Sequence, residues 1–305
     1  MNFLATCTPG VESLVRSELE RQNIKVTYGQ DRLVGFEGDM TTLAQANIWL
    51  RTANRVYIEL DRMIVTSFDA LFTYVESVDW SKWIPGNTPI LISATSIRST
   101  LTHTPTMQSL GKKAIIRQLT QGSDIWHENE LYHPIEVFLL LVGDELRVLL
   151  NTSGDALHKR GYRTEQGEAP IKESLAAAMV LFSGWKFGTP LYDPMCGSGT
   201  IAIETAMIAR NIAPGLNRSF DYLHFPWFDK EIHSTVCAEA KKKKFDKSYQ
   251  IFASDIDGNV LYAAEDNARR AGVTDTIRFT VGDFRDQEYT LKSHLVTNPP
   301  YGKRL

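Results

Sequence analysis

The sequence contains little cysteine. Its 305 residues include three cysteines, Cys7, Cys196 and Cys237, which are odd in number and widely spaced along the chain. Disulfide frameworks and zinc clusters both need paired or closely spaced cysteines, so this pattern argues against both kinds of site. The low cysteine content fits a protein of the reducing cytoplasm, and we expect no bound metal.

An excess of positive charge is also missing. The chain has 33 Lys and Arg residues against 36 Asp and Glu residues, which gives a formal net charge of -3 at pH 7. A protein whose main partner is phosphate would normally carry a positive global charge. Any surface that binds nucleic acid must therefore be local.

Long apolar runs are absent as well. Residues 1–10 have neither the basic start nor the apolar core of a signal peptide, and no later segment holds about eighteen uncharged apolar residues in a row. Export and membrane spanning are therefore not indicated. The hydrophobic share of 43% and the charged share of 23% are typical of a globular protein, and 305 residues are enough for two or three domains.

A glycine loop lies at residues 191–201. An apolar run reaches Asp193, the chain turns through Gly197 and Gly199, and helical periodicity begins at Thr200. Glycines at such a turn let the backbone pass close under a ligand and point N–H groups at it, where the helix dipole favours an electron-rich group. The loop is not a P-loop, because no Gly-Lys-Ser/Thr follows, and on its own it fits any nucleotide-like ligand.

Strands and helices alternate around this loop. This order predicts an α/β domain with a doubly wound, Rossmann-like parallel sheet that binds its ligand at the carboxyl ends of the strands. The expected strands cover residues 191–193, 251–257, 277–283 and 294–298, and the expected helices residues 170–182, 200–210 and 263–272.

Two smaller α+β units are predicted before this domain. Residues 3–60 read as β-α-β-β-α-β, the ferredoxin-like order, and a second α+β unit follows. The expected boundaries are a ferredoxin-like domain at 1–64, the second α+β unit at 65–154, a linker at 155–169 and the doubly wound domain at 170–305. Because the sequence stops four residues after Tyr301, we expect a piece of a longer protein whose catalytic sheet continues.

Basic residues gather in two places. Lys112, Lys113 and Arg117 fall on a predicted helix, and Lys159, Arg160 and Arg163 lie in a polar segment in which Tyr162 could stack on a base. These six cations are the candidates for contact with RNA phosphates, although a solvated helix face is the simpler interpretation of the first group. We assign no chemical role to His158.

An irregular insertion occupies residues 211–250. Its aromatic group at 220–228 is predicted to pack as a local mini-core, and the lysine run at 241–244 to form a solvated helix face. Neither feature needs a ligand.

Acidic residues follow three of the expected strands. Asp255, after the strand that succeeds the glycine loop, is expected to accept hydrogen bonds from ribose hydroxyls. Asp283 would accept from an adenine amino group, and Phe284 would cover the ring. Asp193 could hold the amino group of a cofactor or fix the loop. Each of these acids could instead cap the next helix.

A second motif, Asn298-Pro-Pro-Tyr301, follows the last expected strand. Two prolines free the strand end from ladder pairing and leave carbonyls able to accept hydrogen bonds. The Asn298 side-chain oxygen and the Pro299 carbonyl can accept both hydrogens of a planar amino group, while Tyr301 stacks on the ring that bears it. These two hydrogen bonds orient the nitrogen lone pair toward an electrophile. Most of the rate increase would therefore come from positioning.

These motifs carry a resemblance. Asp193-Pro-Met-Cys-Gly-Ser-Gly-Thr200 with Asn298-Pro-Pro-Tyr301 is similar to the class I S-adenosylmethionine-dependent methyltransferases that act on exocyclic amino nitrogens. Segments 153–163, 169–178, 212–215 and 298–305 resemble the THUMP-domain RNA guanine-N2 methyltransferases, above all the bacterial branch that modifies large-subunit ribosomal RNA.

The resemblance implies a Rossmann-like transferase that uses S-adenosyl-L-methionine, makes N2-methylguanosine during rRNA processing and docks structured RNA on a THUMP domain. It implies that the catalytic residues are Asn298, Pro299, Pro300 and Tyr301, which we call the clamp. The residues it implies for cofactor binding are Asp193, Pro194, Met195, Cys196, Gly197, Ser198, Gly199, Thr200, Asp255, Ile256, Asp283 and Phe284.

Several alternatives stay open. Transfer RNA could be the acceptor for the same chemistry, since THUMP units also recognise tRNA. Amino methylation of DNA adenine or of protein glutamine uses a similar clamp, but neither acceptor needs the N-terminal half. A non-catalytic RNA-binding assembly factor could retain the fold, although its glycine loop and clamp would then have no reason to be intact.

Overall fold

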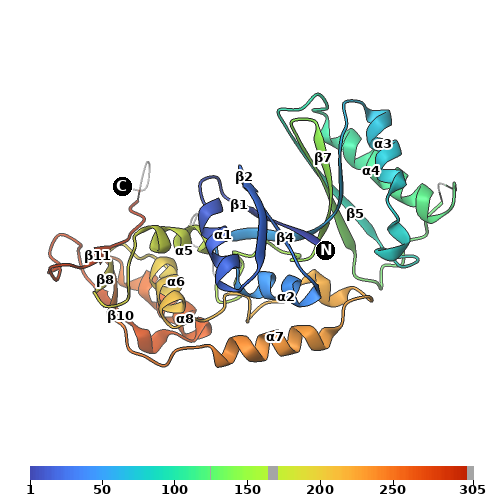
Figure 1. The fold of residues 1–305 in the computed structure, drawn as a ribbon. Helices are drawn as coiled ribbons and strands as arrows, with labels where there is room; N and C mark the ends of the chain where they lie inside the picture. Colours follow the sequence, from blue (N-terminus) through green and yellow to red (C-terminus); the bar gives the residue numbers. More distant parts are fainter. Residues whose placement is uncertain (124, 164–170, 301–305) are drawn as a thin grey trace.

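The computed structural model describes residues 1–123, 125–163 and 171–300. The chain begins with the predicted β-α-β-β-α-β order (Figure 1). The elements are β1 (Asn2–Cys7), α1 (Glu12–Arg21), β2 (Lys25–Gln30), β3 (Leu33–Glu37), α2 (Met40–Trp49) and β4 (Ala53–Ile64). Among the described residues, no helix is long and apolar enough to cross a membrane.

The second α+β unit is joined to the first through one continuous sheet. It consists of α3 (Phe68–Ser77), a short 3-10 turn at Trp80–Lys82, β5 (Ile90–Ile97), α4 (Thr104–Leu119), β6 (Ile135–Val142) and β7 (Glu145–Asn151). The sheet has seven strands in the order β2-β3-β1-β4-β7-β6-β5. Because β4 pairs with β1 on one side and with β7 on the other, the two units do not have separate sheets.

The helices α1 to α4 pack on one face of this sheet. Successive strand residues point to opposite faces, and β6 shows the consequence. Val137 and Leu139 join the core that includes the four helices, whereas Phe138 and Leu140 join a smaller cluster made only of strand residues. The sheet therefore has a helix-covered face and a face lined by strand residues, which we call the open face.

The C-terminal half confirms the predicted Rossmann-like α/β fold. Its elements are α5 (Glu173–Phe182), β8 (Leu191–Asp193), α6 (Thr200–Ala209), α7 (Lys230–Lys242), β9 (Ile251–Asp255), α8 (Gly258–Ala271), β10 (Ile277–Val281) and β11 (His294–Leu295), with short 3-10 turns at Asp221–His224 and Thr274–Thr276. All pairs are parallel, in the order β10-β9-β8-β11. In chain order this is 3-2-1-4, so the winding reverses between β8 and β11. The last strand is shorter than predicted, with two residues in place of five.

The insertion does not form a mini-core of its own, so that prediction is wrong. Phe220, Tyr222, Phe225 and Phe228 belong to the same buried cluster as the N-terminal helices. Helix α7 also lies along α2, as Figure 1 shows at the bottom of the molecule. The aromatic pattern correctly indicated burial, but burial of apolar surface is not directional and the pattern could not name the partner.

Two predictions about the segment after β7 are also wrong. The side chains of Arg160 and Tyr162 are 2% and 1% exposed. Arg160 lies 3.5 Å from Glu204 of α6 and donates to the carbonyls of Arg51 and Leu157, and the Tyr162 hydroxyl donates to Glu204 at 3.1 Å. Arg160 is therefore not available to an RNA phosphate, and Tyr162 cannot stack on a base. Arg160 instead connects Arg51 of the N-terminal half to α6, and Tyr162 packs in the core of the C-terminal half.

Candidate active site

The glycine loop and the Asn298 motif meet at the switch point of the parallel sheet. Leu295 of β11 pairs with Tyr192 of β8, and the N–H of Val296 donates to the Tyr192 carbonyl at 3.0 Å. Asp193 and Asn298 therefore leave the same edge from neighbouring strands. In a doubly wound sheet this edge holds the crevice in which ligands bind.

The two loop glycines are needed for different reasons. Gly197 has a φ of 51° and Gly199 a φ of 80°, both in the left-handed region that favours glycine. A Cβ at Gly199 would lie 3.0 Å from the Cβ of Ala264, so this glycine lets α8 approach. A Cβ at Gly197 would meet nothing within 4 Å. Gly197 therefore borders open space, as expected for a loop that passes under a ligand.

The loop is tied to the end of β9 by Asp255. Its Oδ2 accepts from the Gly197 N–H at 2.9 Å and its Oδ1 from the Asp257 N–H at 3.0 Å. The N–H of Cys196 also donates to the Ser254 carbonyl at 2.9 Å. Sequence reasoning missed this link, because residues 58 positions apart give no local signal of contact. Contact of Asp255 with a ribose stays a prediction.

Asp193 is a buried carboxyl group. It is 1% exposed, and neither carboxylate oxygen has a hydrogen-bond partner among the described residues. Burial raises the pKa of Asp193 to about 7, and the nearby negative charge of Asp255 acts in the same direction. The Thr297 side chain and the Met195 backbone lower this pKa, but by less than burial raises it. Buried polar groups without partners are rare and often belong to a ligand site. The group fits a ligand that brings its own donor.

The third strand end carries Asp283 and Phe284. Arg285 holds the Asp283 carboxylate through its guanidinium at 3.0 Å and its backbone N–H at 2.9 Å, and lowers the pKa of Asp283 to about 2. Asp283 is thus an ionised acceptor. Phe284 is 45% exposed and Ile256, after β9, is 70% exposed. An adenosine group would need hydrogen-bond acceptors such as Asp255 and Asp283. It would also need exposed apolar side chains such as Ile256 and Phe284.

The clamp is described in part. Asn298, Pro299 and Pro300 are exposed after β11, whereas Tyr301 lies outside the described residues. The Thr297 hydroxyl beside them has no hydrogen-bond partner among the described residues. Asn298, Pro299 and Pro300 therefore lie exposed at the sheet edge that Asp193 also leaves, where an acceptor base can reach them.

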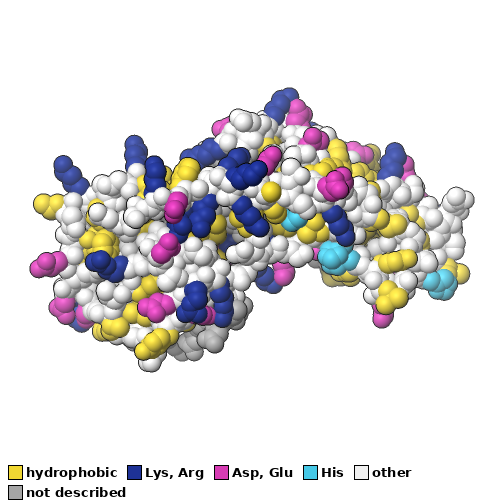
Figure 2. Space-filling model, turned by 90° about the horizontal axis from the view of Figure 1, so that it is seen from below, with side chains coloured by type: hydrophobic (Ala, Val, Ile, Leu, Met, Phe, Trp, Pro, Cys, Tyr) yellow, Lys and Arg dark blue, Asp and Glu magenta, His cyan; other side chains and the backbone are white. Residues whose placement is uncertain are grey.

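The other predicted cations have different surroundings. On α4, Lys112 pairs with Glu128 at 2.7 Å and Arg117 with Glu76 at 3.0 Å, and Lys113 is on the same helix. Figure 2 shows Lys and Arg side chains interspersed with Asp and Glu over the face seen from below, without one dominant basic patch. RNA contact by these cations and by the exposed Lys159 stays a prediction.

Arg163 is directed at the glycine loop. Its guanidinium donates to the Thr200 hydroxyl at the start of α6 and to the Ile171 carbonyl at 3.2 Å, and lies 3.6 Å from Glu173. Its side chain is 11% exposed. The sequence predicts that Arg163 contacts an RNA phosphate, but in the structure it connects the segment after β7 to the glycine loop.

Comparison with known proteins identifies two parts of the chain. Residues 160–305 match the RMKL-like methyltransferase domain, and residues 2–57 match the RlmL ferredoxin-like domain. A curated relative from Bacillus subtilis (strain 168), named "Putative RNA methyltransferase YpsC", is 38% identical over 99% of this chain and 80% of its own.

Solved structures agree with this match. A "predicted N6-adenine-specific DNA methylase" from Listeria monocytogenes str. 4b F2365 is 37% identical, with a TM-score of 0.93 over 100% of this chain and 80% of its own. SMU.472, described as "a putative methyltransferase complexed with SAH", is 36% identical, with a TM-score of 0.90 over 100% of this chain and 81% of its own. The chain therefore belongs to the family of methyltransferases that join an RlmL ferredoxin-like domain to an RMKL-like methyltransferase domain.

Proposed function

We propose that this protein transfers the methyl group of S-adenosylmethionine to the N2 amino group of a guanine in large-subunit ribosomal RNA. The observation that carries the proposal is the meeting of the glycine loop and Asn298 at one switch point. A loop that fits a nucleotide-like ligand and a motif that fits a planar amine are then neighbours, as a transfer between them requires.

The residues of the crevice fit this cofactor. Gly197 borders open space, and Asp193 is a buried acceptor that lacks a partner among the described residues. In our proposal Asp193 accepts from the amino group of the cofactor, Asp255 from the ribose and Asp283 from the adenine amino group, while Phe284 covers the ring. Pro194 has no backbone N–H, and those of Cys196 and Gly199 already donate to the carbonyls of Ser254 and Cys196. In our proposal the loop N–H groups that face the ligand are therefore those of Ser198 and Thr200.

The reaction requires little from the protein beyond orienting the base toward the methyl donor. When bound, S-adenosylmethionine supplies an electrophilic methyl group. Asn298 and the Pro299 carbonyl accept the two amino hydrogens of the base, Tyr301 stacks on its ring, and the amino nitrogen forms the new N–C bond as the S–C bond breaks. The nitrogen then loses one proton, which the exposed edge can release to water. Positioning of this kind supplies most of the rate increase, and no strong general base is needed.

RNA is favoured over DNA as the acceptor by the N-terminal half. The names of the relatives differ, since one is called an RNA methyltransferase and another a DNA methylase. A target base must leave its helix to reach the clamp in either case. The seven-stranded α+β half, whose second unit at 65–154 we propose as a THUMP domain, gives a structured RNA a surface to dock on.

Mass spectrometry of nucleosides tests the proposal. Ribosomal and transfer RNA from a strain that lacks the gene would be incubated with the protein and S-adenosylmethionine. We expect new N2-methylguanosine in large-subunit ribosomal RNA. New N2-methylguanosine in tRNA alone would move the function to tRNA. N6-methyladenine without N2-methylguanosine would refute the guanine assignment, and no methylated nucleoside in any RNA would refute the enzyme.

A further inference from the structure

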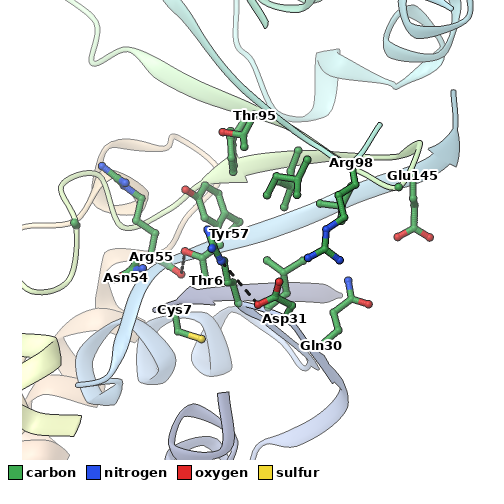
Figure 3. A pocket seen from close by; sticks show the side chains of 18 of the residues that line it. Thr6, Cys7, Gln30, Asp31, Asn54, Arg55, Tyr57, Thr95, Arg98 and Glu145 are labelled. Atoms are coloured by element: carbon green, nitrogen blue, oxygen red, sulfur yellow. Dashed lines mark hydrogen bonds and ion pairs between the residues drawn. The ribbon is translucent and has the colours of Figure 1, made fainter. Parts of the chain in front are cut away.

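The open face of the seven-stranded sheet carries a hollow of about 970 Å³. Its floor is formed by strand residues, among them Thr6 of β1, Tyr57 of β4 and Phe138 of β6. The helices pack on the other face of the sheet, so this hollow is separate from α4 and its cations. Figure 3 shows Arg55 and Arg98 on opposite sides of the hollow.

The hollow has more positive than negative side chains. Its acids are all engaged: Asp31 pairs with Arg32, Asp155 with Lys159 and Glu145 with Arg147. By contrast, no ion pair joins Arg55, Arg98 or Lys172 to a carboxylate in the described part of the chain. Within the described residues, this hollow thus holds cations without an ion-pair partner in a chain whose net charge is -3, and an anionic ligand would be attracted to it.

Two further features distinguish the wall of the hollow. Arg98, just after β5, has a φ of 50°, a left-handed conformation that costs free energy for a residue other than glycine. His158 borders the hollow, and burial together with the charges of Lys172, Arg160, Lys159 and Arg163 lowers its pKa to about 4. Burial is the larger cause of this shift, and the four neighbouring cations act in the same direction.

The hollow leads toward the cofactor loop. A second cavity of about 1030 Å³ shares part of its wall and extends to Arg163, which bonds Thr200 at the start of α6. The shared wall consists of Arg55, Asp155, His158, Lys159 and Lys172. A chain-like ligand that filled both cavities would run from the N-terminal sheet toward the catalytic sheet.

We propose that this hollow binds an unpaired segment of the RNA substrate, with Arg55, Arg98 and Lys172 on its phosphates. The inference rests on the proposed function, which supplies the RNA. The bases of an A-form RNA duplex are stacked inside it and closed to side chains in its deep, narrow major groove, so a duplex cannot place a base in the hollow. Unpaired nucleotides fit a basic groove that offers an aromatic side chain such as Phe138.

Fluorescence anisotropy with an unpaired oligoribonucleotide of about 12 nucleotides tests the proposal, with a hairpin of equal composition as the second probe. The variant is Arg98→Ala/Lys172→Ala. We expect about tenfold weaker binding of the unpaired probe and a salt slope smaller by about 1.4, at about 0.7 per lost phosphate contact. Binding of the hairpin should be weaker than that of the unpaired probe and should change little in the variant.

Two matched variants each remove the same charge elsewhere. Lys242→Ala/Lys244→Ala, at exposed lysines around the end of α7, should bind as the unchanged protein does. Lys112→Ala/Arg117→Ala tests α4 as the rival surface. If the α4 variant loses affinity and the Arg98/Lys172 variant does not, the proposal is overturned. Equal loss in all three variants would also overturn it, because only net charge would then matter.

The experiment separates this inference from the proposed function. Cofactor affinity, measured by calorimetry with S-adenosylhomocysteine, should be unchanged in the Arg98/Lys172 variant, which also shows that it is folded. If RNA is methylated but the unpaired probe binds this variant normally, the inference fails and the function stands. If the probe needs Arg98 and Lys172 but no RNA is methylated, the function fails and the hollow remains an RNA site.

Discussion

The guanidinium of Arg163 donates a hydrogen bond to the hydroxyl of Thr200, the first residue of the helix that follows the glycine loop. The donor belongs to the segment after β7 and the acceptor to helix α6 of the C-terminal half. One bond thus connects the part of the chain that leads from the N-terminal half with the loop that we assign to the cofactor.

Replacing Arg163 by Ala should weaken cofactor binding. The substitution frees the Thr200 hydroxyl and leaves Glu173, which is 4% exposed, without its cation. We expect the Kd for S-adenosylhomocysteine to rise about tenfold, or about 1.4 kcal/mol, in calorimetric titration. Arg163→Lys keeps the charge without the planar fork and should fall in between. A wild-type Kd for the Ala variant would contradict the role, whereas partial unfolding would lower the stoichiometry of binding instead.

Asn298→Ala should separate catalysis from cofactor binding. The variant loses the side-chain oxygen that accepts from the amine but keeps the glycine loop. We expect turnover to be abolished while the Kd for S-adenosylhomocysteine stays within about tenfold, or 1.4 kcal/mol. Lys292→Ala, at an exposed residue before β11, is the matched control and should turn over normally. Near-normal turnover of the Asn298 variant would refute the clamp.

Asp193 should make stability depend on pH. Its pKa is raised to about 7 in the folded protein from an ordinary value of 3.8, so the folded state keeps a proton that the unfolded state loses between these values. Stability is therefore full below about pH 4 and falls as the pH rises to about 7. The loss is at most about 4 kcal/mol, at 1.4 kcal/mol per pH unit.

Asp193→Asn removes this dependence, because the amide mimics the protonated acid. Urea unfolding of both proteins should show the variant to be the more stable one at pH 8, and the difference should vanish near pH 4. Taking the difference cancels the groups that titrate in both proteins. A difference that is independent of pH would show that Asp193 is ionised in the folded state throughout.

Gly215→Ala should destabilise the contact between the insertion and α2. A Cβ at Gly215 would lie 2.7 Å from the Cα of Ile48, and the Gly215 N–H already donates to the Ile48 carbonyl at 2.9 Å. Because the clash is with backbone, we expect a loss of about 1–3 kcal/mol and a lower Tm in calorimetry. At Gly86 a Cβ would meet nothing within 4 Å, so Gly86→Ala is the control. Equal Tm values for the two variants would contradict this packing.

Much of the fold follows from local patterns. The alternation of strands and helices predicts the parallel sheet, and the glycines at 197 and 199 predict a turn with left-handed residues, which the structure has. The edge that brings Asp193 and Asn298 together follows from strand direction alone, since parallel strands end on the same side. These features depend on the period and direction of single elements.

Features that depend on contacts between distant segments could not be predicted. A charged residue type indicates exposure, yet Arg160 is buried because Glu204 and two carbonyls surround it. The aromatic run at 220–228 indicates burial, but only the fold shows that its partners are N-terminal helices. No local pattern in the sequence predicts the hollow on the open face, because its cations Arg55, Arg98 and Lys172 are far apart along the chain.

The contact of residues 211–229 with the N-terminal core limits which sequence changes this protein can tolerate during evolution. The catalytic half contributes aromatic side chains that complete the interior of the other half. A recombinant that took its first 150 or so residues from a distant relative would receive a core with mismatched partners. We therefore expect substitutions at Ile48 and at Gly215 to be accepted in pairs, and the two halves to be inherited together.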